Sequence, residues 1–282
     1  MAKRKAAATT AARVKSIARI SAGLGWVRDL PDPRDQMYSA PLAALKALPN
    51  RVDLTPDFAA YDQGRIGSCT ANALAGAVQF DRLKNRQSPS FEPSRLFIYF
   101  NERRVEGHIA NDSGAQLRDG IKTLQKLGVC PERDWPYDDT PAEYEGGPFP
   151  RGSKPAEEPS RKSYQDAHKY VITNYQRLTP VLSQLQGCLA AGFPFVFGFT
   201  VFQRWYAKNP RPAVIPLPSA SDRAVGGHAV MCVGYNNRTG LFKIRNSWGP
   251  RVGRKGYFFM PYAYLTGGNL ASDFWVINAV KD

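Results

Sequence analysis

Three side chains that can form a nucleophilic site lie far apart in this 282-residue chain. Cys69 precedes His228 by 159 residues, and Asn246 follows after another 18. A thiol, an imidazole and a carboxamide in this order are the components of a Cys/His/Asn site. Any fold that unites them must bring an early segment against a late one, so this spacing constrains the architecture and the chemistry together.

The segment around Cys69 predicts a buried helix that begins at the thiol. Small and apolar residues dominate positions 69–84, which is typical of a helix covered on nearly all sides. A thiolate in the first turn faces unpaired N–H groups, so we expect a pKa below the free value of about 8.5. Gln63 can point its amide at the same space and, with the Cys69 N–H, hold an oxyanion. Taken alone, Cys69 also fits a buried helix cysteine and Gln63 a surface glutamine.

The other two candidates lie at strand-like runs. His228 stands between Gly227 and such a run, which would hold the imidazole rigidly for acid–base chemistry. Asn246 ends the next run, and its side-chain oxygen can accept from one imidazole N–H and set the tautomer. Trp248 can cover that hydrogen bond from water. A core histidine, a capping asparagine and a core tryptophan are the structural alternatives.

Apolar patterning predicts a helical half followed by a sheet half. We expect helices at 69–84, 95–101, 116–127 and 182–190, with Gly128 ending the third. We expect strands at 193–201, 228–235, 241–245, 256–260 and 273–280, with a hairpin turn at 236–240. This order indicates an α+β fold with a cleft between the halves.

The cysteines argue against disulfides and against a metal site. If Cys69 is a nucleophile, three others remain, and an odd number does not make a disulfide framework. Cys188 and Cys232 are expected as small buried hydrophobes and Cys130 as a loop thiol. No Cys/His group has zinc spacing. We therefore expect no metal and no cofactor, and the chemistry is compatible with a reducing compartment.

The net charge of +14 is concentrated at the start of the chain. Six of these charges lie in the first 19 residues: Lys3, Arg4, Lys5, Arg13, Lys15 and Arg19. Such a segment attracts polyanions weakly and without specificity, and we favour a solubilising role over a nucleic-acid role, so no specific nucleic-acid partner is expected. The charges interrupt any signal-like apolar stretch, and no run reaches the roughly 18 residues of a membrane span. We expect a monomer in the cytoplasm or on a non-classical export route.

Together, the segments around Gln63, Cys69, His228 and Asn246 resemble the papain-like cysteine peptidase family. The resemblance covers residues 48–282 and implies a two-subdomain fold with an active-site cleft. It implies a mainly helical left half at 48–137, an exposed insertion at 138–163 and a β-barrel-like antiparallel right half at 164–282. It makes Cys69 the nucleophile, His228 the general base and acid, Asn246 the orienting residue and Gln63 the side-chain oxyanion donor. The short leader and the loop glycines indicate a prokaryotic branch.

Departures from the family pattern concern one disulfide and the substrate cleft. Ile66 stands where the family has the first cysteine of Cys-Gly-Ser-Cys-Trp, and the Cys-Asn-Gly-Gly loop that holds its partner is replaced by Asp112-Ser113-Gly114-Ala115. The resemblance places Ser113 and Gly114 where substrate backbone binds, and it adds Gly227 and Trp248 to the substrate site. Gly227 also replaces an acid often found beside the histidine. A further set falls near the subsite for the residue second from the cut, which is expected to be apolar or open: Gln116, Leu117 and Gly198.

The leader, residues 1–47, is too short for the family's usual helical prodomain. Its stiff, aromatic-anchored segment 26–35 is hypothesised to fold back and block the cleft. A tail that is trimmed or used for targeting is the alternative. For the whole chain we predict a cysteine endopeptidase acting on peptides or proteins. Transpeptidase or isopeptidase chemistry on the same residues, and an inactive binding module with a basic tail, are the competing hypotheses.

Overall fold

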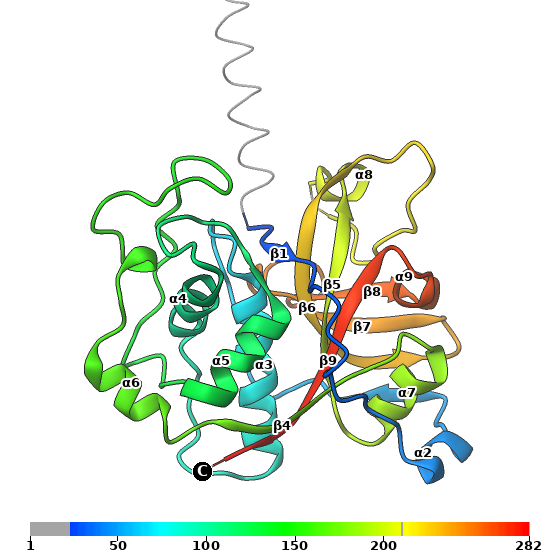
Figure 1. The fold of residues 1–282 in the computed structure, drawn as a ribbon. Coiled ribbons are helices and arrows are strands. Elements are labelled where there is room, and N and C mark those ends of the chain that lie inside the picture. The colour runs from blue at the N-terminus through cyan, green and yellow to red at the C-terminus, as the bar shows by residue number, and fades with distance from the viewer. Residues whose placement is uncertain (1–22, 210, 282) are drawn as a thin grey trace, which may run out of the picture.

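The structure is a computed structural model that describes residues 23–209 and 211–281. The six basic residues at the start of the chain, and the weak polyanion binding expected of them, therefore lie outside the described residues. Helices gather on one side of the molecule and a curved antiparallel sheet on the other (Figure 1). The predicted α+β architecture with two halves is confirmed. Among the described helices, none combines the length and apolar character of a membrane span.

Four helices form the helical half: α3 (Cys69–Lys84), α4 (Arg95–Glu106), α5 (Leu117–Leu127) and α6 (Arg161–Ala167). The predicted bounds of α3 hold, but the expected helix at 95–101 was too short. Ser94 caps α4 by accepting from the Phe97 N–H, and the helix ends at Gly107 in the left-handed conformation. In its polar last turns the buried Arg103 donates to the carbonyls of Ile109 and Asn111 in the loop that follows.

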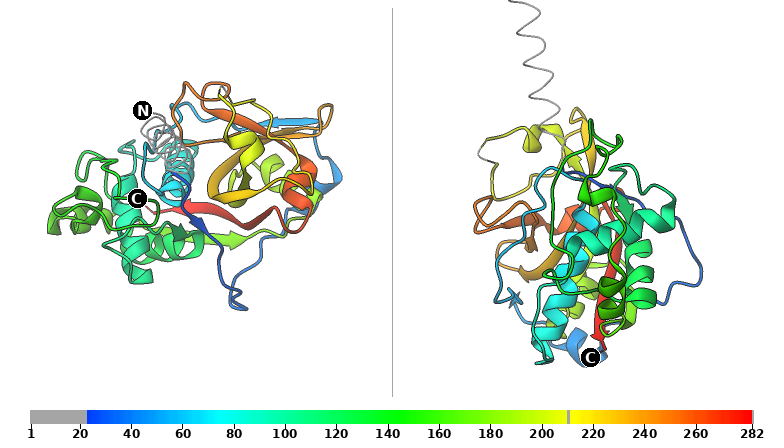
Figure 2. Two further views of the ribbon diagram at one scale, coloured as in Figure 1. Left: turned by 90° about the horizontal axis from the view of Figure 1, so that it is seen from above. Right: turned by 90° about the vertical axis from the view of Figure 1, so that its left-hand side faces the viewer.

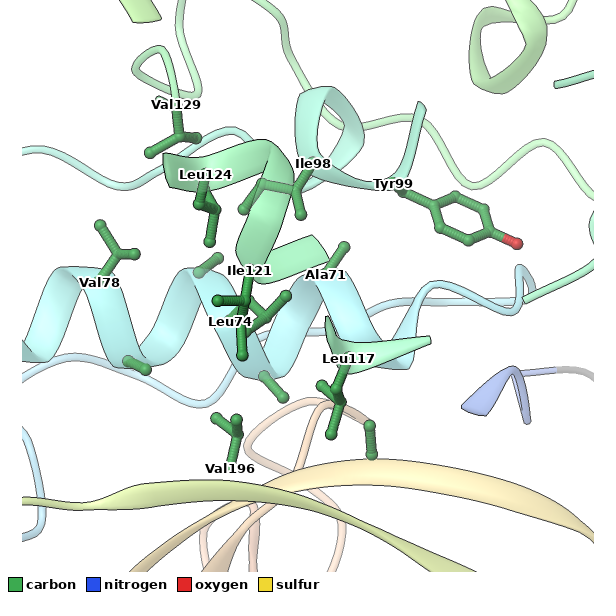
Figure 3. Close-up of a cluster of buried hydrophobic side chains, with 14 of the residues drawn as sticks. Ala71, Leu74, Val78, Ile98, Tyr99, Leu117, Ile121, Leu124, Val129 and Val196 are labelled. Carbon is green, nitrogen blue, oxygen red and sulfur yellow. The ribbon is translucent and has the colours of Figure 1, made fainter. Parts of the chain in front are cut away.

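Helix α3 lies at the centre of the molecule because its small residues allow close packing on both sides. Leu74 and Val78 meet Ile121 and Leu124 of α5, while Val196 reaches the same cluster from the sheet (Figure 3). All are buried. The N-terminus of α3, where Cys69 lies, is thereby fixed at the boundary between the two halves.

A seven-stranded antiparallel sheet forms the other half. Its order is β4 (Ile172–Arg177), β9 (Ala271–Val280), β5 (Phe195–Phe202), β6 (Ala224–Asn236), β7 (Leu241–Arg245) and β8 (Tyr257–Pro261), with β2 (Arg51–Asp53) paired to β6. The hairpin turn between β6 and β7 is confirmed. The sheet curves strongly, but the pairings among the described strands do not close a barrel. Strand β4 was not predicted, since its sequence carries polar residues.

Apolar side chains of the sheet pack against short helices. The helices are α7 (Leu182–Ala190), as predicted, α8 (Gln203–Tyr206), α9 (Tyr262–Thr266) and α2 (Leu42–Lys46). Phe195, Phe197 and Phe199 form the centre of this second core, and Cys188 and Cys232 lie within it. Both cysteines are small buried hydrophobes, as expected.

The connection at 138–163 is less exposed than predicted. It has little regular structure apart from the turn η1 (Lys154–Ala156), and α6 begins within it at Arg161. Phe149 is nonetheless buried, with the Arg103 guanidinium 4.9 Å from its ring centroid. Arg103 also donates to the Pro155 carbonyl. The loop therefore covers α4, because the buried guanidinium needs carbonyl acceptors that the loop supplies.

Residues 23–47 do not stand apart from the body. Strand β1 (Trp26–Val27) pairs in parallel with β3 (Ala115–Gln116). From there the chain passes in front of β9 toward α2, as the blue segment of Figure 1 shows. Seen from above, β1 lies between the helices and the sheet (Figure 2). We call residues 23–35 the strap.

Candidate active site

The structure brings the imidazole and the carboxamide into direct contact. Nε2 of His228 lies 2.7 Å from Oδ1 of Asn246, and both side chains are buried. Because a carboxamide oxygen only accepts, Nε2 carries the hydrogen. Nδ1 is buried and has no hydrogen-bond partner among the described residues. The imidazole is therefore held in the tautomer whose Nδ1 lone pair is free to take a proton.

The thiol lies against the strand that carries this imidazole. Backbone N–H groups of Ala229, Gly25 and Thr70 face the Cys69 sulfur. Ala229 directly follows His228 in β6, while Thr70 belongs to the first turn of α3. The thiol thus lies at the junction of the two halves, against the backbone of the residue that follows His228.

Trp248 covers the imidazole. Its ring stacks on His228 at a centroid distance of 4.7 Å and an interplanar angle of 25°. Trp205 stacks on Trp248 in turn, and the Arg211 guanidinium lies 4.9 Å from the Trp248 centroid. The predicted shielding of the His228–Asn246 hydrogen bond is confirmed. A contact between Trp248 and substrate stays a prediction.

Burial makes the thiol and the imidazole neutral in this arrangement. It raises the pKa of Cys69 to about 12, and the three N–H groups that face the sulfur oppose this only in part. Burial lowers the pKa of His228 to about 4, against the opposing effect of Asn246. The expected ionised thiol is therefore wrong for this state. The physical reason is desolvation, since Cys69 and His228 are both fully buried and their charged forms lose contact with water.

Gln63 points its amide into the same space, but its donor is already used. Nε2 donates to the carbonyls of Gly23 and Ile66, at 2.8 and 2.9 Å. Oε1 accepts from Ser247 Oγ at 2.6 Å, which fixes the orientation of the amide. The backbone carbonyl of Gly23 thus occupies a donor that the sequence assigned to an oxyanion.

Three glycines let the strap approach the site closely. A Cβ on Gly25 would lie 1.7 Å from the Gly67 carbonyl oxygen, and one on Gly114 would lie 2.0 Å from the Gly25 oxygen. That oxygen accepts from the Ala115 N–H at 2.8 Å. Gly114, predicted to bind substrate backbone, therefore lies against strap backbone. The Ser113 hydroxyl donates to the Gly114 carbonyl. The binding of substrate backbone by Ser113 stays a prediction.

Gly227 also lies against the strap. A Cβ there would lie 2.4 Å from the Trp26 carbonyl oxygen and 2.6 Å from Cε3 of its ring. The residue that precedes His228 thus has no side chain, and this leaves room for the strap. The contact gives a steric reason for the absence of an acid at this position.

A carboxylate joins the two loops that the resemblance links by a disulfide elsewhere in the family. Asp112 accepts the Gly67 N–H at 2.9 and 3.1 Å and the Tyr99 hydroxyl at 2.5 Å. The Tyr99 oxygen in turn accepts the Gly114 N–H at 3.2 Å. All four cysteines are free and buried, including Cys130, which was expected as a loop thiol. A buried hydrogen-bond network therefore connects the nucleophile loop to the loop at 112–115.

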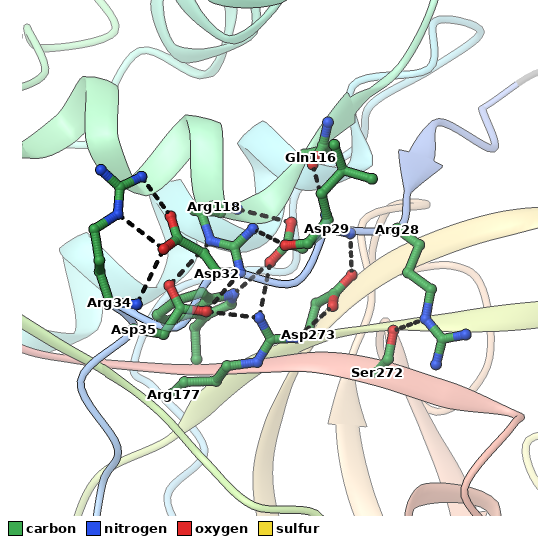
Figure 4. Close-up of polar contacts among 12 residues, drawn as sticks. Arg28, Asp29, Asp32, Arg34, Asp35, Gln116, Arg118, Arg177, Ser272 and Asp273 are labelled. Carbon is green, nitrogen blue, oxygen red and sulfur yellow. Dashed lines mark hydrogen bonds and ion pairs between the residues drawn. The ribbon is translucent and has the colours of Figure 1, made fainter.

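Charged side chains attach the strap to both halves (Figure 4). Asp35 lies 2.5 Å from Arg118 of α5 and 2.9 Å from Arg177 of β4. Asp29 accepts from the Arg118 N–H and from Trp275 Nε1, and its own N–H donates to Asp273. The sequence did not reveal this network, because its members are separated by up to 246 residues. The only signal was the clustering of aspartates in a proline-containing segment.

Comparisons with known proteins agree with this geometry. The model of the papain family of cysteine proteases matches residues 48–269. The chain is similar to xylellain, a cysteine protease from Xylella fastidiosa, with 54% identity, 93% of this chain and 98% of that chain covered, and a TM-score of 0.89. A peptidase C1-like protein of Acanthamoeba polyphaga mimivirus is 36% identical over 93% of this chain and 89% of its own length.

A more distant structure shares the fold. Procathepsin B S9 from Trypanosoma congolense is 15% identical and has a TM-score of 0.71, with 92% of this chain and 87% of that chain covered. The similarity shows that the two-part arrangement persists where little of the sequence does.

Proposed function

This chain belongs to the papain family of cysteine proteases and is a cysteine peptidase, and we propose that it is an endopeptidase held latent by its own strap. We assign the nucleophile to Cys69, the general base and acid to His228, the orienting group to Asn246 and the side-chain oxyanion donor to Gln63. The His228–Asn246 hydrogen bond, the Ala229 N–H that faces the Cys69 sulfur and the Ser247 hydroxyl that orients Gln63 support the assignment.

In the open enzyme, Cys69 Sγ attacks the carbonyl carbon of a peptide while His228 Nδ1 takes the thiol proton. Asn246 keeps Nε2–H pointed away, so Nδ1 faces the sulfur. The oxyanion accepts from Gln63 Nε2 and the Cys69 N–H. The imidazolium then gives its proton to the leaving amine, and water, activated by the same nitrogen, hydrolyses the thioester.

One observation carries the proposal of latency. The strap places the Gly23 carbonyl on Gln63 Nε2 and the Gly25 backbone over the Cys69 sulfur, so a substrate carbonyl has no access to either group. The same burial keeps the thiol and the imidazole neutral. Blocking and deactivation therefore have one cause, and both end when the strap leaves.

A single substitution tests this in the full chain. In Gly25→Ala, the added Cβ would lie 1.7 Å from the Gly67 backbone, a contact that no side-chain rotation relieves. We expect the strap to leave the cleft while the body is unchanged. Alkylation of Cys69 by an epoxide, followed by mass spectrometry, and cleavage of a fluorogenic peptide should both rise at least tenfold. Leu30→Ala, at a strap side chain that is 71% exposed, is the matched control.

Two results would overturn the proposal. If the unsubstituted chain and Gly25→Ala are alkylated and cleave the peptide at equal rates, the strap does not hold the enzyme latent. A Gly25→Ala chain that is alkylated at Cys69 but transfers the acyl group to an added amine, with no hydrolysis, would replace peptidase by transferase activity. Cys69→Ala serves as the blank in both assays.

A further inference from the structure

The hydroxyl of Tyr137 joins the two segments that carry the assigned oxyanion donors. It donates to the backbone carbonyl of Gln63 at 3.0 Å. A carbonyl oxygen only accepts, so the single hydrogen of the Tyr137 hydroxyl is committed there, and the Ser68 hydroxyl, 2.5 Å away, donates to the Tyr137 oxygen. Gln63 is therefore linked to Ser68, the residue before Cys69, through one phenolic oxygen.

Gln63 is held at every polar group other than one hydrogen of Nε2. Its backbone N–H donates to the Ser247 carbonyl at 2.8 Å, and its Oε1 accepts from the Ser247 hydroxyl at 2.6 Å. Tyr137 holds the backbone carbonyl. One Nε2 hydrogen goes to Ile66 in the same loop, and the other goes to Gly23 of the strap. Departure of the strap therefore frees one donor on a residue whose backbone stays fixed.

The second donor, the Cys69 N–H, is oriented through Ser68. The Ser68 carbonyl accepts from the backbone N–H of Asn72 at 3.0 Å and from its Nδ2 at 2.9 Å. Nδ2 also donates to the Ser68 hydroxyl at 3.1 Å. Because the peptide between Ser68 and Cys69 is planar, a fixed carbonyl fixes the direction of the N–H. Ser68 and Asn72 are both buried, so these contacts are shielded from water.

A buried arginine holds Tyr137 in place. The Arg95 guanidinium lies 4.1 Å from the centroid of the Tyr137 ring and pairs with Glu132 at 3.1 Å. Glu132 accepts the backbone N–H of Tyr137 at 2.8 Å. Arg95 also donates to the carbonyl of Asp62, the residue before Gln63, at 3.1 Å. The same cation thus holds the ring and the loop, and burial raises the pKa of Tyr137, so the hydroxyl keeps its hydrogen.

The relative position of the two donors affects the reaction only when charge develops on the substrate oxygen. An oxyanion hole accelerates acyl transfer because its N–H groups are already placed for that oxygen, and a shift on the order of 1 Å can cost about 100-fold in rate. Alkylation of the sulfur forms no oxyanion and does not depend on this placement. A group that fixes the two donors therefore affects peptide cleavage and leaves alkylation unchanged.

We propose that Tyr137 is a positioning residue of the oxyanion hole, whose hydroxyl holds the Gln63 amide at the correct place relative to the Cys69 N–H. The hydroxyl contacts the backbone of one donor segment and the side chain of the other. It acts through Gln63 and touches no reacting atom. The inference rests on the proposed peptidase function and adds to it a residue that supports the transition state from outside the reacting groups.

Tyr137→Phe in the full chain carrying Gly25→Ala tests the proposal, because it removes the hydroxyl and keeps the ring on Arg95. We expect kcat for a fluorogenic peptide to fall about tenfold while KM changes less than about twofold. Alkylation of Cys69 by iodoacetamide, in which the sulfur displaces iodide, should keep its rate within about twofold. Equal kcat in the two chains, or parallel losses of kcat and alkylation, would overturn the proposal.

A second tyrosine provides the matched control. Tyr61 lies close to Gln63 in the chain, and the Arg95 guanidinium lies 4.9 Å from its ring centroid. Its hydroxyl donates to Gln79 of α3 and not to the loop backbone. Tyr61→Phe should therefore leave kcat within about twofold. A loss as large as that of Tyr137→Phe would show that the effect is general to hydroxyls of this cluster and would contradict the specific role.

A double-mutant cycle shows whether the effect passes through Gln63. In the same background, Gln63→Ala should lower kcat about 100-fold or more, because it removes the amide donor itself. Tyr137→Phe should then lower kcat by less than a further factor of about two, since no amide remains to be placed. A further tenfold loss in the double variant would show that Tyr137 acts by another route.

The positioning role and the peptidase function can fail separately. If the Gly25→Ala chain cleaves no peptide, the peptidase proposal is wrong, and the positioning role is then judged with a peptide aldehyde. Cys69 Sγ adds to the aldehyde carbon, the thiol hydrogen passes to the aldehyde oxygen, and that oxygen lies where the oxyanion would. The dissociation constant should be about fivefold higher in Tyr137→Phe. Equal dissociation constants, or no adduct in either chain, would overturn the role.

Discussion

Asn246 holds His228 through a 2.7 Å hydrogen bond from Nε2–H to Oδ1, and that bond is enclosed by Trp248. The geometry leaves Nδ1 as the only ring nitrogen that can act as a base. The orientation of the imidazole therefore depends on one buried side-chain contact, and its loss has a measurable consequence.

We expect Asn246→Ala to lower kcat/KM about 10- to 100-fold in the Gly25→Ala background. The substitution leaves a buried N–H without an acceptor and frees the ring to rotate, and a hydrogen bond of this kind is worth roughly 1.5–3 kcal/mol once the imidazole is charged. Steady-state kinetics measure the effect. Asn85→Ala, at the exposed end of α3, is the matched control, and a change of less than twofold in Asn246→Ala would contradict the assigned role.

Latency should deepen in acid. Burial, and then the neighbouring Asp273, raise the pKa of Asp29 from 3.8 to about 6 in the docked strap. In the released strap the pKa returns toward its ordinary value, so docking takes up a proton. Docking is therefore strongest below about pH 4 and weakens as the pH rises through about 6, by a factor on the order of 100.

The measurement is the rate of Cys69 alkylation in the unsubstituted chain divided by that in Gly25→Ala, which cancels the titration of the thiol itself. This ratio should rise between pH 4 and 7. Asp29→Asn cannot titrate and should flatten the rise. A ratio that falls with increasing pH would show that other groups govern docking.

Asp35 should contribute far more than Asp32 to the attachment of the strap, although both are strap aspartates with arginine partners. Asp35→Ala leaves Arg118 and Arg177 without their shared carboxylate, and the Arg118 side chain is only 5% exposed. We expect Cys69 alkylation to accelerate about tenfold or more. Asp32 pairs with Arg34, whose side chain is 83% exposed, and at 3.7 Å with Lys122, which is 45% exposed, so Asp32→Ala should change the rate less than twofold. Similar rates in the two variants would refute the attachment described here.

Asp112→Ala should destabilise the nucleophile loop. The substitution removes the acceptor of the Gly67 N–H and of the Tyr99 hydroxyl in a buried position. We expect a loss of roughly 3 kcal/mol in the free energy of unfolding, measured by urea denaturation. Asp57→Ala, at an exposed position, should lose less than about 0.5 kcal/mol. A loss in Asp112→Ala no larger than that of the control would rule out this network as the substitute for a cross-link.

Much of the fold could be predicted because its elements have strong local patterns. The apolar helix from Cys69, the helix that ends at Gly128 and the strand from Leu241 all follow from periodicity and from glycine stops. Strand β4 could not be found, since its polar residues look like a loop and its pairing with β9 is a long-range contact.

The candidate site, too, could be predicted only in part. His228, Asn246 and Cys69 could be placed because the chemistry of a thiol site restricts which residues can accompany each other. Their protonation could not, because it depends on complete burial of both side chains, which is a property of the tertiary structure. The position of the Asp273 carboxylate, which accepts from the Trp26 indole, could not be predicted either. Its position depends on a bulge in β9, which no local sequence pattern predicts.

In the proposed latent state the strap and the cleft belong to one continuous chain, so the degree of inhibition would not depend on protein concentration. An inhibitor that binds from solution is lost on dilution, whereas a tethered one keeps the same effective concentration at any dilution. Activation then requires a change in the tether itself, by cleavage between Asp35 and the body or by titration of its attachment. A secreted or strongly diluted molecule would remain as inactive as a concentrated one.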